Sequence, residues 1–149
     1  MPTTPSDAAD AVTRELRVEA RPETLFALLT DPSEITRWLG QTATIDARPG
    51  GIFRVTVNDT DIARGSYLEV VPHERVVFTW GWERGGAPLA PGSTTVEFTL
   101  IAQGDSTLVR LRHLGLPPEL RESHGAGWDM MLGNLTTAAT FDDHTSEGG

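Results

Sequence analysis

The sequence predicts an α+β domain in which a curved antiparallel sheet of about seven strands carries two short helices and one long C-terminal helix. Two observations support this. Residues 42–114 form six stretches, most of them alternating apolar and polar side chains, separated by turn-forming residues, as in strands with one buried face. Over residues 120–139, six side chains recur at helical spacing on one face: Leu120, His124, Trp128, Met131, Leu132 and Leu135. The predicted order is therefore strand, two helices, six strands and a helix.

The elements before and within the sheet follow from local signals. Residues 14–20 alternate, which predicts a half-buried strand that precedes the two helices. Pro22 suits the first turn of a helix, and the Asp31 carboxylate can cap a second helix that ends at Gly40. Gly65, within a long strand, is typical of a bulge or of a bend where the sheet curls.

The connection over residues 84–93 is predicted to be the longest loop. It holds three glycines and two prolines, a composition that fits either a plain connection or a flap with an apolar tip at the rim of the sheet. Both interpretations stay open at this point.

The chain length fits one domain. Its 149 residues can bury one full core but not two. Residues 1–12 and 142–149 are polar and lack the apolar surface that would offset the entropy cost of ordering, so we expect disordered tails there. The folded domain is predicted to span residues 13–141.

Composition argues against several classes of partner. The formal net charge is −9, from 21 acidic and 12 basic residues, so nucleic acid and anionic membrane surfaces are not expected as partners. Cysteine is absent, which excludes disulfides and cysteine ligands to a metal. No run reaches the roughly 18 apolar residues of a membrane span, and the first residues do not read as a signal peptide, so we expect a cytoplasmic protein.

The sequence offers no catalytic motif. The histidines at positions 73, 113, 124 and 144 lack the spacing of a zinc-binding helix, and the serines lie outside a nucleophile elbow. The paired glycines lack the context of a phosphate-binding loop. We therefore expect no metal and no cofactor, the catalytic residues remain unknown, and a binding protein is favoured over an enzyme.

Several short motifs, in their order along residues 14–139, resemble one family. They are Arg21-Pro22-Glu23-Thr24-Leu25-Phe26, Asp31-Pro32, Arg37-Trp38, Arg48-Pro49-Gly50-Gly51 with Phe53, Gly65-Ser66-Tyr67-Leu68-Glu69-Val70-Val71-Pro72, Glu74-Arg75-Val76-Val77-Phe78-Thr79-Trp80, His113 and Gly127-Trp128. The chain is similar to the START-like (SRPBCC, helix-grip) superfamily, within its branch of homologues of the activator of heat shock protein 90 ATPase. The resemblance implies a helix-grip fold.

The resemblance also implies a hydrophobic cavity between the long helix and the sheet. Combined with pleat parity and helical spacing, it predicts these ligand-binding residues: Phe53, Tyr67, Phe78, Trp80, Phe98, Leu111, His113, His124, Trp128, Met131 and Leu135. The alternative is that they pack together as a solid core. His113 and His124 could contact a ligand or carry a proton, or each could be hydrogen-bonded to backbone or to Glu69.

Three functions follow from this resemblance. The first is binding of an apolar or aromatic small molecule. The second is an enzyme similar to polyketide cyclases and aromatases, in which His113, Tyr67 or His124 moves a proton. The third is a chaperone-associated stress-response module, although the eukaryotic namesakes carry a further N-terminal domain where this chain has a short tail. A hydrophobic small molecule is the expected partner, and a homodimer stays open.

Overall fold

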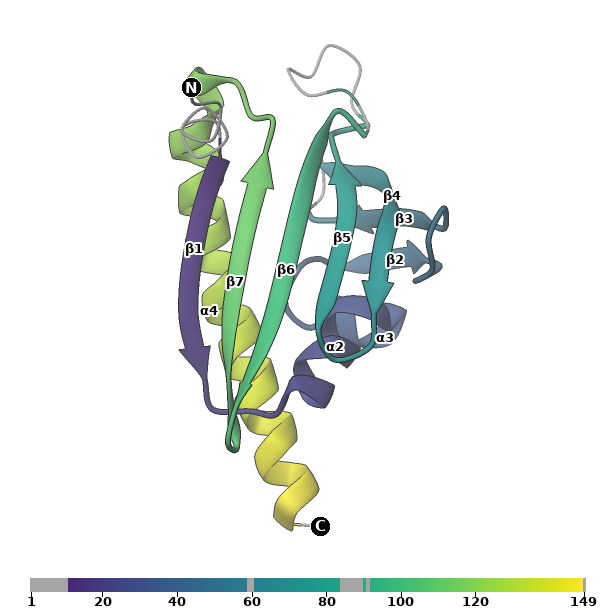
Figure 1. Ribbon diagram of the computed structural model, residues 1–149. Coiled ribbons are helices and arrows are strands. Elements are labelled where there is room, and N and C mark those ends of the chain that lie inside the picture. Colours follow the sequence, from purple (N-terminus) through teal and green to yellow (C-terminus); the bar gives the residue numbers. More distant parts are fainter. Residues whose placement is uncertain (1–10, 59–60, 84–89, 91, 149) are drawn as a thin grey trace.

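The computed structural model confirms the predicted α+β architecture (Figure 1). It describes the backbone of residues 11–58, 61–83, 90 and 92–148 and the side chains from residue 12 to residue 141 within these ranges. The elements are β1 (Ala11–Val18), α2 (Pro22–Thr30), α3 (Pro32–Ile35), β2 (Thr42–Ile45), β3 (Ile52–Thr56), β4 (Ile62–Val71), β5 (Arg75–Trp80), β6 (Thr94–Gln103), β7 (Ser106–Leu114) and α4 (Pro118–Gly148). Most of the loop expected over residues 84–93 lies outside the described residues.

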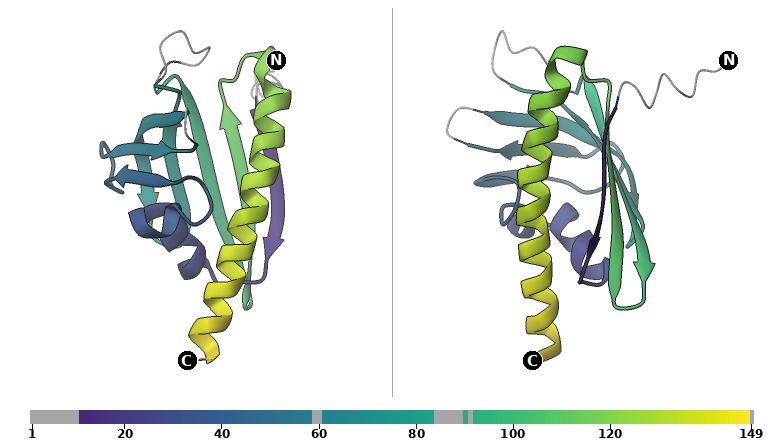
Figure 2. Two further views of the ribbon diagram at one scale, coloured as in Figure 1. Left: turned by 180° about the vertical axis from the view of Figure 1, so that it is seen from behind. Right: turned by 90° about the vertical axis from the view of Figure 1, so that its left-hand side faces the viewer.

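The sheet is an open, seven-stranded antiparallel sheet in which β2 to β7 form a meander and β1 is the edge strand beside β7. Its order is β1-β7-β6-β5-β4-β3-β2, so β1 pairs with the last strand and β2 lies at the opposite edge. The helix α4 crosses one face of this curved sheet, and α2 and α3 lie beside it on the same face (Figures 1 and 2). Among the described residues, no helix combines the length and the apolar character that crossing a membrane requires.

The terminal elements are longer than the sequence predicted. β1 begins at Ala11, because Ala11 and Val12 already pair with Leu114 and His113 of β7, although residues 11 and 12 were expected in a tail. α4 continues to Gly148, so the backbone of residues 142–148, also expected in a tail, extends the helix.

Two buried side-chain hydrogen bonds fix the short helices to the core. α2 buries Leu25, Leu28 and Leu29. The Trp38 indole donates from Nε1 to the Leu28 carbonyl at 2.6 Å, and the Tyr67 hydroxyl on β4 donates to the Leu29 carbonyl at 3.1 Å. Burial of both donors makes these bonds costly to lose, since each would leave an unpaired polar group in the core.

The predicted cap of the second helix is present. The Asp31 carboxylate accepts a hydrogen bond from the Ser33 amide at 2.9 Å and another from the Ser33 hydroxyl at 2.7 Å. These bonds stabilise the ionised carboxylate and lower the pKa of Asp31. The helix that follows is only four residues long and continues as a turn that buries Trp38 and Leu39.

The strand β4 joins the two halves of the sheet. Its residues before Tyr67 pair with β3, and from Tyr67 onward it pairs with β5. The register shift falls between Tyr67 and Glu69, so the bulge lies two residues beyond the predicted position at Gly65. Gly65 instead allows the backbones of β4 and β5 to approach closely, because a Cβ atom there would overlap the Thr79 carbonyl of β5.

Charged side chains pair across the strands on the face away from α4. Arg110 donates to Glu15 at 2.8 Å, and Arg75 donates to Glu69 at 2.9 Å. Most of these side chains are more than one-third exposed, so each pair contributes little to stability. These charged side chains keep this face of the sheet exposed to water, and the opposite face forms the core.

A Gly65→Ala substitution should lower the free energy of unfolding by about 1–3 kcal/mol, because the added methyl group forces β4 and β5 apart. Urea unfolding measures this change. Gly133→Ala is the matched control: its Cβ meets open space on α4, and removing a helical glycine should stabilise the protein by about 0.5–1 kcal/mol. Equal stabilities of the two variants would contradict the close approach at Gly65.

Candidate functional site

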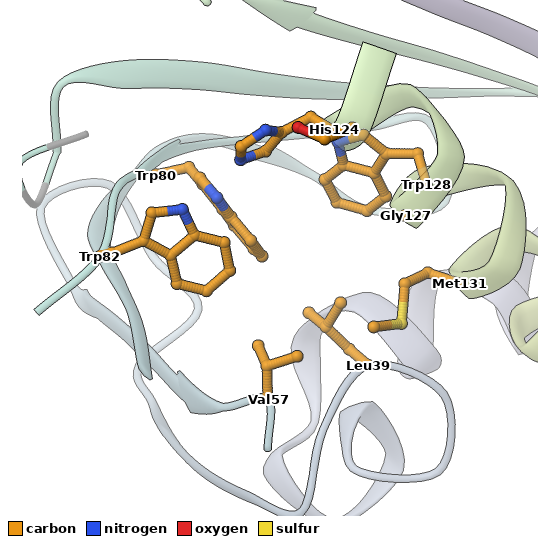
Figure 3. A pocket seen from close by; sticks show the side chains of 9 residues that line it. Leu39, Val57, Trp80, Trp82, His124, Gly127, Trp128 and Met131 are labelled. Atoms are coloured by element: carbon orange, nitrogen blue, oxygen red, sulfur yellow. The ribbon is translucent and has the colours of Figure 1, made fainter. Parts of the chain in front are cut away.

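A partly open apolar pocket of about 280 Å³ lies between α4 and the sheet. One wall comes from α4, and the others come from β5 and from the segments that follow β5, α3 and β3. The lining residues are Leu39, Val57, Trp80, Trp82, Ser123, His124, Gly127, Trp128 and Met131. Figure 3 shows the side chains of Trp80, Trp82 and His124 gathered at one end, with Leu39, Val57 and Met131 on the other side.

The Trp80 ring contacts the two other indole rings of the pocket wall, those of Trp82 and Trp128. The Trp80 ring packs against Trp82 with centroids 5.3 Å apart and planes 79° apart, and against Trp128 with centroids 5.5 Å apart. Such edge and tilted contacts add to the stabilisation from burying the rings. The rings hold one another in place, so this wall is preformed.

Ion pairs position Trp82, which follows the end of β5. Trp82 bridges to Ala63 of β4, and the next residue, Glu83, accepts hydrogen bonds from Arg54 at 2.6 Å and from Arg64 at 3.3 Å. The Arg54 bond is the main reason that the pKa of Glu83 is lowered, with Arg64 contributing. The carboxylate thereby ties the segment carrying Trp82 to β3 and β4.

A chain of buried hydrogen bonds positions Trp128. The Trp128 Nε1 donates to His113 Nδ1 at 2.9 Å, so the other ring nitrogen of His113 carries the proton and donates to Thr94 Oγ1 at 2.8 Å. The Thr94 hydroxyl then donates to the Trp80 carbonyl at 2.7 Å. Every polar atom in this chain is paired, and it links α4 to β7, β6 and β5.

Burial keeps the His113 imidazole neutral. The side chain is fully buried, and desolvation, aided by the neighbouring His124, lowers the pKa of His113 to about 3. Of the two alternatives from the sequence, the hydrogen-bonded structural histidine fits this geometry. Its two ring nitrogens bond to Thr94 and Trp128, so the predicted hydrogen bond to backbone or to Glu69 is not formed. Glu69 pairs with Arg75 instead.

His124 differs from His113 because one of its ring nitrogens has no partner. Its Nδ1 donates to the Leu120 carbonyl at 3.1 Å, which confirms the expected bond to backbone. Nε2 is buried and, within the described part of the chain, unpaired; the same holds for Nε1 of Trp80. Burial lowers the pKa of His124, so its ring is neutral at pH 7 and Nε2 is a free hydrogen-bond acceptor.

The structure brings some of the expected ligand-binding residues to the pocket and leaves the others in the core. Those that line it are Trp80, His124, Trp128 and Met131. Those that do not are Phe53, Tyr67, Phe78, Phe98, Leu111, His113 and Leu135, all fully buried. The reason is aromatic packing: Phe53 stacks on Phe78 at 4.0 Å, and Phe78 lies 6.4 Å from Phe98 in a nearly parallel arrangement. These rings fill the space that a larger cavity would need.

Sequence reasoning missed Leu39, Val57, Trp82, Ser123 and Gly127 as lining residues. A signal existed for Trp82, which alternates with Trp80 along the strand, and for Gly127, which lies on α4 next to Trp128. Leu39 and Val57 follow the ends of short elements, and only the tertiary fold brings them together. Within the described ranges, no group of three or more histidine, aspartate or glutamate side chains is arranged to hold a metal ion.

The comparison with known families agrees with this fold. The model of the family described as Activator of Hsp90 ATPase homolog 1-like protein matches residues 19–140. The chain belongs to this family. This match confirms the START-like resemblance that the sequence motifs indicated. A separate comparison with curated proteins found no match.

Solved structures of similar proteins have the same fold. An AHSA1-like protein from Rhizobium etli is 45% identical, with a TM-score of 0.67, over 87% of this chain and 81% of its own. CalU16 from Micromonospora echinospora is 30% identical, with a TM-score of 0.71, over 85% of this chain and 71% of its own. DynU16, from the dynemicin biosynthetic locus, is 25% identical with a TM-score of 0.74; the match covers 86% of this chain but only 46% of DynU16.

The buried neutral His113 should make the protein acid-sensitive. Its pKa is about 3 in the folded state and near 6.5 when unfolded, so below pH 6.5 the unfolded chain binds a proton that the folded chain does not. The free energy of unfolding should therefore fall by about 1.4 kcal/mol per pH unit down to about pH 3.

His113→Gln tests this, because an amide can still accept from Trp128 and donate to Thr94 without titrating. Between pH 7 and pH 4, the free energy of unfolding measured in urea should fall by about 3 kcal/mol less in this variant than in the wild type. His73→Gln, at an exposed turn between β4 and β5, is the control for replacing a histidine by glutamine. Identical profiles for all three proteins would rule out His113 as the source.

Proposed function

We propose that this protein binds an apolar, aromatic small molecule in the pocket between α4 and the sheet. The observation that carries the proposal is the lining: three indoles, Leu39, Val57 and Met131 surround a space whose polar groups are few. Small-molecule sites are typically concave and mostly apolar, with a few polar groups that orient the ligand. Direct ligand contacts are proposed for Trp80, His124, Trp128 and Met131, together with Trp82.

The size of the pocket limits the ligand. At about 280 Å³ it lies just below the range of roughly 300–1,000 Å³ for small-molecule sites. The stacked core rings leave no further room behind Trp80. We therefore expect a ligand of one or two fused rings, flat enough to lie against an indole.

The relatives are compatible with small-molecule chemistry. DynU16, which is 25% identical, is described as a protein of the dynemicin biosynthetic locus. That description belongs to DynU16; for this chain it is compatible with a small-molecule ligand. The Aha1 dimer from Colwellia psychrerythraea has a TM-score of 0.73 but only 18% identity, so it shows the fold alone. A chaperone role and a homodimer thus have weaker support than ligand binding.

One observation favours a second function, acid–base catalysis on the bound ligand. The unpaired Nε2 of His124 is a neutral base at the pocket, and histidine is the side chain most often used for proton transfer. The test is conversion: a ligand recovered from the protein should be consumed by the wild type about 10²-fold faster than by His124→Gln. A ligand that both proteins bind unchanged identifies a binding protein.

Native mass spectrometry of protein purified from its own host tests the binding function. We expect a co-purified mass that disappears on denaturation and belongs to a compact aromatic compound. Protein without any added mass, which also fails to bind aromatic probes in solution, would contradict the proposal.

A Gly127→Leu substitution should block the pocket. Gly127 lines it, and a Cβ at this position meets open space, so a leucine side chain can occupy part of the ligand volume without disturbing the core. Binding of a naphthalene probe, measured by calorimetry, should weaken at least about tenfold.

Gly133→Leu is the matched control, because Gly133 lies on the same helix, also has open space at its Cβ and does not line the pocket. Both variants replace a helical glycine and should be at least as stable as the wild type. Equal probe affinity in the two variants would place the ligand elsewhere.

A further inference from the structure

Two residues that line the pocket each have a buried nitrogen atom without a hydrogen-bond partner among the described residues; one nitrogen is a donor and the other an acceptor. Trp80 is 4% exposed, and its Nε1 carries a hydrogen that no group in the described part of the chain accepts. His124 Nε2 is likewise buried and unpaired. Native proteins pair nearly all buried polar atoms, since an unpaired one costs about 1–3 kcal/mol. Two such atoms in residues that line one pocket point to a missing partner.

The two groups belong to the same end of the pocket. Trp82 packs against both, with ring centroids 5.3 Å from Trp80 and 6.1 Å from His124. The buried His113 ring also neighbours both, at 6.1 Å and 5.8 Å. In Figure 3 the Trp80 indole and the His124 imidazole lie near each other at this end, away from Leu39 and Met131.

The hydrogen-bonding role of each atom is fixed. An indole Nε1 can only donate. The Leu120 carbonyl can only accept, so His124 places its hydrogen on Nδ1 and leaves a lone pair on Nε2. The neutral state of the ring, favoured by burial, keeps this arrangement near pH 7. Within the described ranges, two residues of the pocket wall therefore carry one unpaired donor and one unpaired acceptor, both of them buried atoms.

We infer that the ligand is an aromatic molecule bearing a hydroxyl group, which accepts a hydrogen bond from Trp80 Nε1 and donates one to His124 Nε2. This inference rests on the proposed function and specifies its ligand class. A hydroxyl group is both a donor and an acceptor, so it satisfies both atoms. The aromatic body then lies against Trp82 and Trp128.

Other polar groups fit this end less well. A carboxylate offers no hydrogen to the His124 lone pair, and an ammonium group offers no acceptor to the Trp80 donor. Either charge would also lose its hydration without gaining a counterion, because none of the described residues that line the pocket is charged. An ether accepts but cannot donate, so it would leave His124 unpaired.

Three probes of similar shape test the inference: naphthalene, 2-naphthol and 2-methoxynaphthalene. Their affinities for the wild-type protein are measured by calorimetry at pH 7. We expect 2-naphthol to bind about tenfold or more tightly than either of the others, since it alone can form both hydrogen bonds. Because all three probes share the naphthalene ring, the ratio of two affinities reports only the effect of the group attached to the ring.

Two variants assign the preference to its atoms. Trp80→Phe keeps an aromatic ring but removes the donor, and His124→Leu removes the acceptor; each should reduce the naphthol preference severalfold. Trp82→Phe is the matched control, because it also shrinks an indole of the same wall but removes neither buried unpaired atom. It should weaken all three probes alike and leave the preference unchanged.

Each outcome is decisive. Equal binding of the three probes by the wild type would overturn the hydroxyl inference while the proposed binding function stands. A naphthol preference that survives both Trp80→Phe and His124→Leu would overturn the assignment to these two residues. Binding of none of the probes would overturn the proposed function together with the inference. Should either variant fail to fold, the wild-type ratio still decides the ligand class.

Discussion

The hydrogen-bond chain from Trp128 through His113 and Thr94 to the Trp80 carbonyl is the constraint on which the site depends. An apolar helix lying on an apolar sheet can slide or rotate with little change in buried area, because the hydrophobic effect is not directional. A buried donor with a single acceptor removes that freedom, since losing the bond leaves unpaired groups without water. The chain therefore sets where α4 lies over β5, β6 and β7, and with it the distance between Trp80 and Trp128.

The pocket is the space that remains where the core stops being filled by its own rings. Between α2 and the sheet, Phe53, Tyr67 and Phe78 pack together, and the Tyr67 hydroxyl closes that end by bonding to Leu29. At the other end α4 presents Gly127 rather than a large side chain, and the surface opens. The same fold thus has a solid half that supplies stability and an open half that can accept a ligand.

Much of the fold was predictable because it rests on local patterns. Strand alternation, the Asp31 cap and the spacing along α4 are each written in neighbouring residues, and the structure confirms them. The site was predictable only in part. Pleat parity places Phe53, Phe78 and Trp80 on one face but does not say which of them meets another ring and which meets empty space. Val57 and Leu39 join the pocket only through pairing between distant elements, which leaves no local signal.

The clustering of tryptophans has an optical consequence. Three of the four tryptophans in the chain line the pocket, and Trp80 contacts both of the others. The fourth, Trp38, lies beneath α2 with its indole bonded to Leu28. Rings this close exchange excitation energy, so we expect a ligand in the pocket to change the ultraviolet emission and the near-ultraviolet circular dichroism of the protein. The chain carries its own spectroscopic reporter of occupancy, and it needs no attached label.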